Sequence, residues 1–455
     1  MNVQTGQMAL RRSGMPAASV NVVAGLVPTA FIAALLLRIS LPWELLDLFW
    51  HYSTPGGSIF EKIHPGAYAL FIVCTAVYIT RARSSDSVDR KLDSASKQFI
   101  LALLAVILLS VATNHVQGVS YILDSVLLSP IVAMAMLKLN RAEHMRIFHI
   151  LIWFMIANDV LTFVEYVTHF RLFPYQYAIN ESAAVFRPAA LLGHPLVNGL
   201  LNAIFIPLVW LLPTTTTRRV VLMLFFLAAD FASGARIASI AGLAITLMSS
   251  WLYLWQSAKQ RRIDEGVMVV SALLAVGVIL LAALVIVTSG LADRLLQNGL
   301  AFTDQSSRSR FDVFRILGYL TKQQLMFGVS REWSTYLLTK QLSLQAIENP
   351  ILAFVVEFGI VGTTILVTGL LYFIWRLARI SGGNFVSLSI LTFVVIEATS
   401  ISIASKGPQM ALIGALYVSA QAFTRSRPAA ARAHIGSPRR TVAPRRPQLA
   451  NRQGG

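Results

Sequence analysis

Six acidic residues lie inside long apolar stretches of this sequence, where an ionised side chain is costly. At the centre of a lipid bilayer the cost is roughly 2.5–3.5 kcal/mol on insertion scales, so such residues are candidates for proton transfer, ion pairing or substrate contact. Each has a structural alternative, because a carboxylate near the end of a stretch reaches water and one inside a bundle can pair with a neighbour. The six are Asp124, Asp159, Glu165, Asp230, Glu357 and Glu397.

Two arginines at the ends of apolar stretches have surroundings that suit a phosphate ligand. Arg187 occurs in FRPAALLGHPLVNG and Arg236 occurs in SGARIASIAGLA. A guanidinium group is planar, keeps its charge and matches a phosphate with two parallel hydrogen bonds. The small residues before Arg236 allow a ligand or a backbone to approach closely. The pair predicts a site for a pyrophosphate-linked lipid; the alternative is that both side chains merely extend from buried stems to the membrane interface.

The longest polar segment, residues 290–349, carries a second basic group. Its basic residues recur every seven positions and its apolar residues every three, which predicts an amphipathic helix that lies on the membrane or covers a cavity. The basic positions are Arg308, Arg315 and Lys322, and the apolar positions are Phe311, Phe314, Leu317 and Leu320. Trp333 and Tyr336 follow, and their rings could stack on sugars or simply pack against the protein.

The composition indicates which elements must position these residues. The chain has 455 residues, of which 56% are hydrophobic and 13% are charged, and its mean hydropathy is +0.65. Soluble domains have roughly 25% charged residues, so we expect an all-α, polytopic membrane bundle. A span needs roughly 17–25 mostly apolar residues. Twelve stretches qualify: 21–38, 65–80, 98–113, 121–137, 147–168, 193–212, 219–232, 237–255, 266–289, 350–375, 385–403 and 409–424.

The distribution of Lys and Arg predicts how the bundle is oriented. Without the 290–349 loop and the C-terminal tail, one side of the twelve spans carries 17 of these residues and the other carries 6. The richer side is expected in the cytoplasm. Residues 1–20, the polar segment 81–97, which is expected to be a loop, and the tail 425–455 are then cytoplasmic, and the 290–349 loop, between the ninth and tenth helices, faces the periplasm. The tail is rich in Pro, Ala and Arg, which predicts disorder.

Several other classes of site are disfavoured. The net charge is +17, but the basic residues flank apolar runs or lie in the tail, which favours topology signals and anionic lipids over nucleic acid. The single cysteine, Cys74, lies in an apolar run, and the eight histidines lack ligand spacing, so neither a disulfide nor a metal site is expected. The first apolar run ends in Arg38 without a cleavage pattern and is expected to remain as a helix.

Four short motifs resemble those of the O-antigen ligase and polysaccharide polymerase superfamily, in the same order along the chain. They are FRPAALLGHPLVNG, SGARIASIAGLA, SRFDVFRILGYLTKQQLMFGVS and ENPILAFVVEFGIVG. In the last, the family pattern is His-Asn, then Leu, then Glu-x-Gly and a further Gly. Glu348 stands here in place of the family's histidine. The matching positions are Asn349, Leu352, Glu357, Gly359 and Gly362. The resemblance covers roughly residues 100–425.

This resemblance implies a metal-independent glycosyltransferase without a cofactor, at the periplasmic face of a bacterial inner membrane. An acceptor sugar hydroxyl attacks a glycan carried on polyprenyl pyrophosphate, and the pyrophosphate leaves with its lipid. Glu348 would take the proton, as a carboxylate can when burial raises its pKa, and Asn349 would orient the acceptor or cap a helix. The pyrophosphate ligands would be Arg187, Arg236 and Arg310. Secondary candidates are His194, Asn198, Arg308, Arg315, Trp333, Tyr336 and Glu357.

Three functions remain open. The exchange of histidine for Glu348 favours a polymerase of exopolysaccharide or O-antigen repeat units. A ligase, which moves a finished glycan to a lipid or protein acceptor, is the alternative within the same fold. The expected partners are lipid-linked oligosaccharide, membrane lipid, a flippase and a chain-length regulator. A secondary transporter or flippase is the alternative from another class, although no matching pair of broken helices is visible in the sequence.

Overall fold

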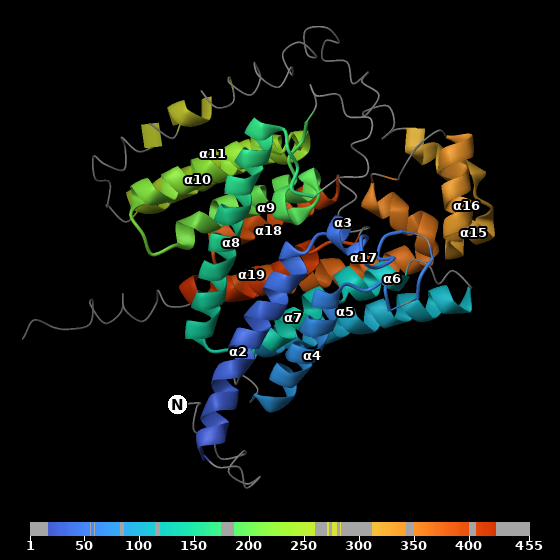
Figure 1. The fold of residues 1–455 in the computed structure, drawn as a ribbon, viewed down its shortest axis with the longest axis horizontal. Helices are drawn as coiled ribbons and strands as arrows, with labels where there is room; N and C mark the ends of the chain where they lie inside the picture. The colour runs from blue at the N-terminus through green and yellow to red at the C-terminus, as the bar shows by residue number, and fades with distance from the viewer. Residues whose placement is uncertain are drawn as a thin grey trace, which may run out of the picture.

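The computed structural model shows a bundle of helices (Figure 1). It describes residues 17–54, 56–58, 60–81, 86–113, 119–173, 186–259, 271–272, 275–279, 283, 312–342, 347, 349–399 and 406–424, with the backbone alone at 17–25, 236 and 331. Within these ranges every regular element is helical and no strand occurs. The predicted all-α class is therefore confirmed for the described part of the chain.

The helices follow one another with short connections in the first half of the chain. They are α2 (Ala17–Ser40), α3 (Trp43–Leu46), α4 (Pro65–Thr80), α5 (Ser87–Ala112), α6 (Val119–Tyr121) with the π-helical turn η2 (Ile122–Val126), α7 (Leu128–Met136) and α8 (Arg141–Thr168). Next come η5 (Ala190–Leu192), α9 (Pro195–Leu208), η6 (Val209–Leu211), α10 (Thr216–Ala232) and α11 (Arg236–Lys259). The last group is η7 (Val313–Tyr319), α15 (Lys322–Phe327), α16 (Arg331–Tyr336), η8 (Leu337–Gln341), α17 (Pro350–Ser381), α18 (Asn384–Glu397) and α19 (Gln409–Thr424).

The predicted spans coincide with these helices, except that 266–289 lies largely outside the described residues. Within the described residues, five helical stretches are long and apolar enough to cross a membrane, and the total of twelve spans stays a prediction. The five are Ser87–Ala112, Val119–Met136, Arg141–Thr168, Ile237–Lys259 and Pro350–Ser381.

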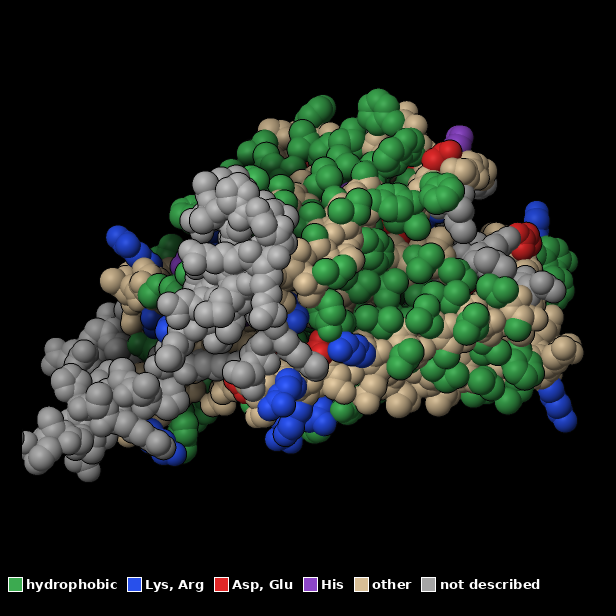
Figure 2. All heavy atoms as spheres, turned by 90° about the horizontal axis from the view of Figure 1, so that it is seen from below, with side chains coloured by type: hydrophobic (Ala, Val, Ile, Leu, Met, Phe, Trp, Pro, Cys, Tyr) green, Lys and Arg blue, Asp and Glu red, His purple; other side chains and the backbone are tan. Residues whose placement is uncertain are grey.

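Large apolar side chains cover the outside of these helices. Figure 2 shows hydrophobic side chains over much of the described surface on the face seen from below. Such an apolar surface is costly in water and is expected where the solvent is lipid. Examples are Leu101 and Leu108 on α5, Trp153 on α8, Leu371 on α17 and Leu391 on α18.

Three helices begin with the same device, a capping side chain followed by proline. His64, His194 and Asn349 each accept a backbone N–H from the first turn of the helix that follows, and a proline occupies the next position. Proline suits that position because the N–H it lacks would have no partner in the helix. Local sequence therefore fixes where α4, α9 and α17 start.

The core is built around α19. Its side chains from Gln409 to Ala422 are buried, and it packs against α7, α8 and α17. A helix that is apolar on all sides is stable only when surrounded by protein or lipid. The stretch 409–424 is thus a helix enclosed by the other helices of the bundle.

Two local predictions were wrong. The polar segment 81–97 is not all loop, because Asp86 caps α5 and the helix begins at Ser87. The predicted amphipathic helix of the long loop is interrupted: η7 ends before Leu320, whose backbone is extended, and Thr321 caps a separate helix, α15.

The period of three in that loop belongs to a 3-10 helix, in which every third side chain lies on the same face. The buried face of η7 is made by Val313 and Ile316, whereas Phe314 is 48% exposed. Val313 and Ile316 form a small hydrophobic cluster with Leu352 and Val356, so the loop helices pack on the start of α17.

Candidate functional site

The candidate residues gather at one end of the bundle, which we call the loop end. Here α2, α8 and α10 finish, and α4, α9 and α17 begin. Gly66 of α4 is in close contact with Arg38 in the last turn of α2, where an added Cβ would lie 2.6 Å from the arginine backbone. The ring of Tyr121, at the start of the η2 turn, stacks on Phe354 of α17 with 6.3 Å between centroids.

The segment before α9 is held in place by Glu165, in the last turn of α8. This buried carboxylate accepts backbone N–H groups from Leu172 (2.8 Å), Ala189 (2.9 Å) and Ala190 (3.0 Å). Backbone N–H groups that leave water need acceptors, and the Glu165 carboxyl supplies one to each of these three. Glu165 therefore positions the segment that carries Arg187 rather than taking part in chemistry.

Arg187 lies against the turn that leads into α11. A Cβ added to Gly234 would be 3.3 Å from Cγ and 3.4 Å from Nε of Arg187, and the φ of Gly234 is +65°. Glycine is thus required by both the backbone and the approach of the arginine. The side chain of Arg236, two residues further on, lies outside the described residues. The structure nevertheless brings together the two arginine-bearing segments that the sequence keeps 49 positions apart.

A second guanidinium lies in the same place and was missed by sequence reasoning. Arg171 donates through Nη2 to the backbone carbonyl of Arg187 at 3.0 Å, and its Cζ is 4.7 Å from the centroid of the Phe186 ring. Nothing in the local sequence marks it, because it follows α8 in an ordinary loop. Two cationic side chains therefore lie at this segment. We call Arg171, Arg187 and Gly234 together the arginine cluster.

A carboxyl group borders the arginine cluster and was also missed. Glu44 of α3 is 5% exposed, and neither of its carboxyl oxygens has a hydrogen-bond partner. A Cβ added to Gly193 would lie 2.5 Å from its Oε2, so the carboxyl fills the space that this glycine leaves beside α9. Burial raises the pKa of Glu44 to about 8, against smaller lowering effects of the residue's own backbone N–H and of the charge of Arg171.

The two secondary candidates at the start of α9 have structural partners. His194 caps the helix through Nδ1, which accepts the N–H of Leu196 at 3.1 Å. Asn198 accepts from the Asn158 amide and donates to the Thr162 hydroxyl, each at 2.8 Å. His194 therefore fixes the start of α9, and Asn198 joins α9 to α8.

The long loop meets α17 where that helix is broken. Gly359 has φ 67° and ψ 177°, which no α-helix allows, and the backbone of Met326 and Phe327 at the end of α15 lies directly against it. Gly328, with φ +88°, lies against the carbonyl of Glu357, and Val329 donates its N–H to Val356 at 2.9 Å. The Phe-Gly of the loop motif and the Glu-x-Gly of the last motif are therefore packed backbone to backbone.

The remaining loop candidates are exposed or lie outside the described residues. Arg315 is 68% exposed at its side chain and 4.0 Å from Asp312. Trp333 and Tyr336 stack on each other, with centroids 5.4 Å apart, and are 39% and 45% exposed. Asn349 accepts the N–H of Leu352 at 3.0 Å, as a helix cap does. The structure does not describe Arg308, Arg310 or Glu348.

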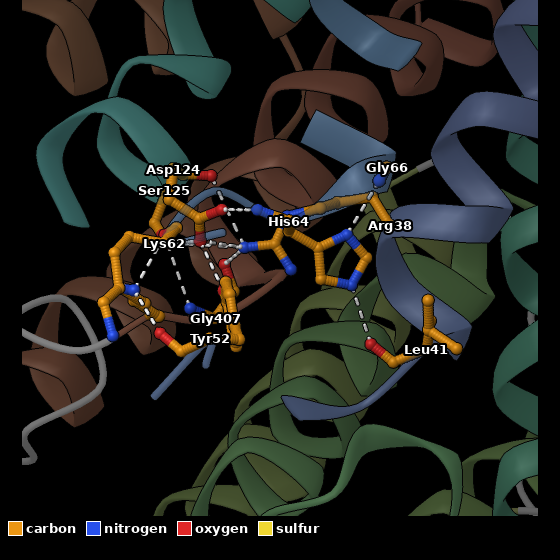
Figure 3. Close-up of polar contacts among 10 residues, drawn as sticks. Arg38, Leu41, Tyr52, Lys62, His64, Gly66, Asp124, Ser125 and Gly407 are labelled. Atoms are coloured by element: carbon orange, nitrogen blue, oxygen red, sulfur yellow. Dashed lines mark hydrogen bonds and ion pairs between the residues drawn. The ribbon is translucent and has the colours of Figure 1, made fainter. Parts of the chain in front are cut away.

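A buried ion pair fastens the middle of the loop end (Figure 3). Arg38 and Asp124 meet at 3.0 Å with 3% and 0% of their side chains exposed. The Tyr52 hydroxyl donates to Asp124 at 2.6 Å, and the His64 N–H donates at 2.6 Å. Arg38 also donates to the carbonyl of Gly407 at 2.7 Å. Asp124 thus connects α2 and the segment before α4 to the η2 turn. Arg38 connects the same group to Gly407, just before α19.

The other intramembrane carboxyls differ in their surroundings. Glu357 is partly buried beside the break in α17, and Glu397, the last residue of α18, is 1% exposed. Asp159 of α8 and Asp230 of α10 are both fully buried. No group of three His, Cys, Asp or Glu side chains that could hold a metal ion occurs among the described residues.

This arrangement can hold an anion at the loop end. Guanidinium groups offer paired donors for phosphate oxygens. The starts of α4, α9 and α17 add the partial positive charge of helix N-termini, which favours negative ligands. No protein-family model and no curated protein matches this chain.

Proposed function

We propose that this chain is a membrane glycosyltransferase that joins repeat units carried on polyprenyl pyrophosphate, at the periplasmic face of the inner membrane. The observation that carries the proposal is the packing of Arg187 against Gly234, which brings the two arginine motifs together. A binding site for pyrophosphate needs convergent guanidinium groups, and the two segments that would supply them are neighbours. The contact of Gly328 with the backbone of Glu357 adds a second pair of motifs that lie together, in the loop and in α17.

In this proposal the arginine cluster neutralises the leaving group. Breaking the bond between the sugar and the pyrophosphate leaves negative charge on the phosphate oxygens, and fixed cations placed there lower the barrier. Arg187 and Arg236 bind the pyrophosphate, and Arg171 holds the segment of Arg187 by its bond to that backbone carbonyl. The loop helices on α17 hold the acceptor, so that two substrates meet in one orientation.

The proton of the acceptor hydroxyl goes to Glu348 in this proposal. That role rests on the resemblance to the family, in which a histidine occupies the position. Asn349 acts on the protein instead of the substrate, since its side chain caps α17.

The test uses purified protein and a synthetic lipid-linked repeat unit, with polymer length measured by gel electrophoresis. Arg187→Ala and Arg236→Ala are expected to lower chain growth by at least about 100-fold, the usual loss when a preorganised charge contact is removed. Arg187→Lys keeps the charge but loses the planar pair of donors, so its chain growth should lie between that of the alanine variants and that of the wild type. Arg218→Ala is the matched control, because this arginine is exposed in the first turn of α10, at the other end of that helix from Gly234, and it should retain full activity.

The outcome also separates the alternatives within the fold. Growth of polymer on the lipid indicates a polymerase, whereas transfer to a separate lipid or protein acceptor indicates a ligase. Unchanged polymer in both alanine variants, with protein levels equal to the wild type, contradicts the proposed role of the arginines.

A transporter is the second candidate, and one observation favours it. Transporters build substrate sites from discontinuous helices, and α17 is broken at Gly359, where Phe358 lies 6.0 Å from the Tyr121 ring beside the η2 turn. Reconstituted vesicles loaded with the lipid-linked unit decide between the two classes. Movement of the unit across the bilayer without chain growth supports a transporter.

A further inference from the structure

Beneath the arginine cluster, one helical turn further into the bundle, lies a group of buried acceptor oxygens without donors. Asp230 of α10 has neither carboxyl oxygen hydrogen-bonded, although the residue is completely buried. Oδ2 of Asp159 and Oδ1 of Asn202 are likewise buried and have no partner. Buried polar atoms are nearly always paired, so four such atoms in one region require an explanation.

These atoms lie close together. The charge of Asp159 acts on the Asp230 carboxyl group, and the Asn202 side chain lies next to Asp159. A Cβ on Gly199, three residues before Asn202 on α9, would be 3.0 Å from Oδ1 of Asp230. A Cβ on Gly242 of α11 would lie closer still to Oδ2. The two glycines leave room for the carboxyl group between α9 and α11.

The nearby hydroxyls serve mainly the backbone. Those of Ser233 and Ser239 donate to the backbone carbonyl of Asp230, at 2.6 Å and 3.4 Å, and the Ser239 hydroxyl also lies near the Asp230 carboxyl group. The Asn158 amide donates to Oδ1 of Asp159 at 3.2 Å, which leaves Oδ2 open. Among the described side chains, no Lys, Arg or His forms an ion pair with either aspartate.

An isolated ionised carboxylate in such a setting is very costly unless a positive charge accompanies it. Oxygen ligands without nitrogen or sulfur suit a hard cation. A divalent ion is a poor match, because Ca²⁺ takes six to eight oxygens and Mg²⁺ usually keeps several waters. A single positive charge cancels one carboxylate, and the second is neutral when it holds a proton.

We propose that Asp230, Asp159 and Asn202 bind a monovalent cation, sodium by preference, between α8, α9 and α10. The ion would connect these helices one helical turn below Gly234. It would thereby stabilise the turn between α10 and α11 that precedes Arg236. The site is independent of the reaction proposed above, since it concerns the folded protein alone.

The experiment measures thermal unfolding of the purified full chain at constant ionic strength in NaCl, KCl or choline chloride. A ligand that binds only the folded state raises the unfolding temperature with its concentration. Sodium is expected to raise it by roughly 2 °C or more relative to choline, and potassium by less. Asp230→Asn should remove this dependence. Asp89→Asn, the same exchange in the first turn of α5, should keep it.

Equilibrium dialysis with radioactive sodium provides a second measurement. The wild type is expected to retain one ion per chain and Asp230→Asn none, and Asn202→Ala should weaken the binding. If Asp230→Asn does not fold, the wild type and Asn202→Ala decide. A wild-type protein that responds equally to sodium and choline, or an Asp230→Asn protein that still binds sodium, overturns the proposal.

Discussion

Glu44 offers the most direct test of the loop end, because its titration should be visible in the stability of the whole protein. Its carboxyl group is buried against Gly193 without a hydrogen-bond partner, and burial raises the pKa of Glu44 from 4.5 to about 8. The folded state therefore binds a proton that the unfolded chain releases above pH 4.5. The contribution of this neutral carboxyl is complete below that pH and is lost as the pH rises to 8.

The magnitude follows from linkage. Between pH 4.5 and 8 the free energy of unfolding falls by about 1.4 kcal/mol for each pH unit, on the order of 3 kcal/mol by pH 7. Glu44→Gln has no proton to lose and removes this slope. The difference in stability between the variant and the wild type should thus move in favour of the variant as the pH rises, whatever constant offset the amide itself introduces.

The assay is chemical unfolding of the detergent-solubilised full chain at pH values from 4.5 to 8.5. Glu61→Gln is the control, since Glu61 lies in the same segment and accepts backbone N–H groups from Ser58 and His51, both at 3.4 Å. These bonds lower the pKa of Glu61, so its contribution is lost only as the pH falls through that lowered value. A difference between Glu44→Gln and the wild type that stays constant with pH would refute the buried, neutral carboxyl.

Three further predictions concern other parts of the loop end. Asp124→Asn leaves the buried Arg38 charge without its partner and should cost about 3–5 kcal/mol in unfolding free energy; a cost below about 1 kcal/mol would mean that the pair is solvated. Gly328→Ala forces a side chain onto the Glu357 carbonyl at φ +88° and should release the loop helices, seen as faster proteolysis within residues 312–342 than in Gly318→Ala, where the space is open. Trp333→Ala should change stability by less than about 0.5 kcal/mol and raise KM for a lipid-linked sugar about 2- to 12-fold, the range of one aromatic contact; an unchanged KM would remove it from the sugar site.

The candidate site was only partly predictable, and the reasons differ between residues. Arg187 stood out because its motif mixes arginine with small residues at the end of an apolar stretch, and the structure places it at such an end, against Gly234. Arg171 and Glu44 were missed because each lies in a connector between predicted spans, where exposure is the ordinary expectation. Glu44 is buried where α3 packs against Gly193.

The amphipathic pattern of the long loop shows a different limit. A period of three residues fits both an α-helical face and a 3-10 helix, and the two bury different side chains. Phe314 was assigned to the apolar face, yet Val313 and Ile316 are the buried residues. Which side chains of η7 are buried depends on its contacts with α17, and these contacts cannot be deduced from the local sequence.

The sequence by itself determined the class of protein and where several helices begin. Its apolar runs and low charge predict a helical membrane bundle, and a capping residue before proline sets the start of α4, α9 and α17. These features depend on residues close together in the chain.

What only the tertiary structure decided is the state of each buried carboxyl group. Asp124 pairs with Arg38 across 86 positions, Glu165 accepts backbone N–H groups, and among the described residues no hydrogen bond reaches either carboxyl oxygen of Asp230. All three read alike in the sequence, as acids in apolar stretches. Their chemistry differs because the charge or donor opposite each one is supplied by the packing of distant segments.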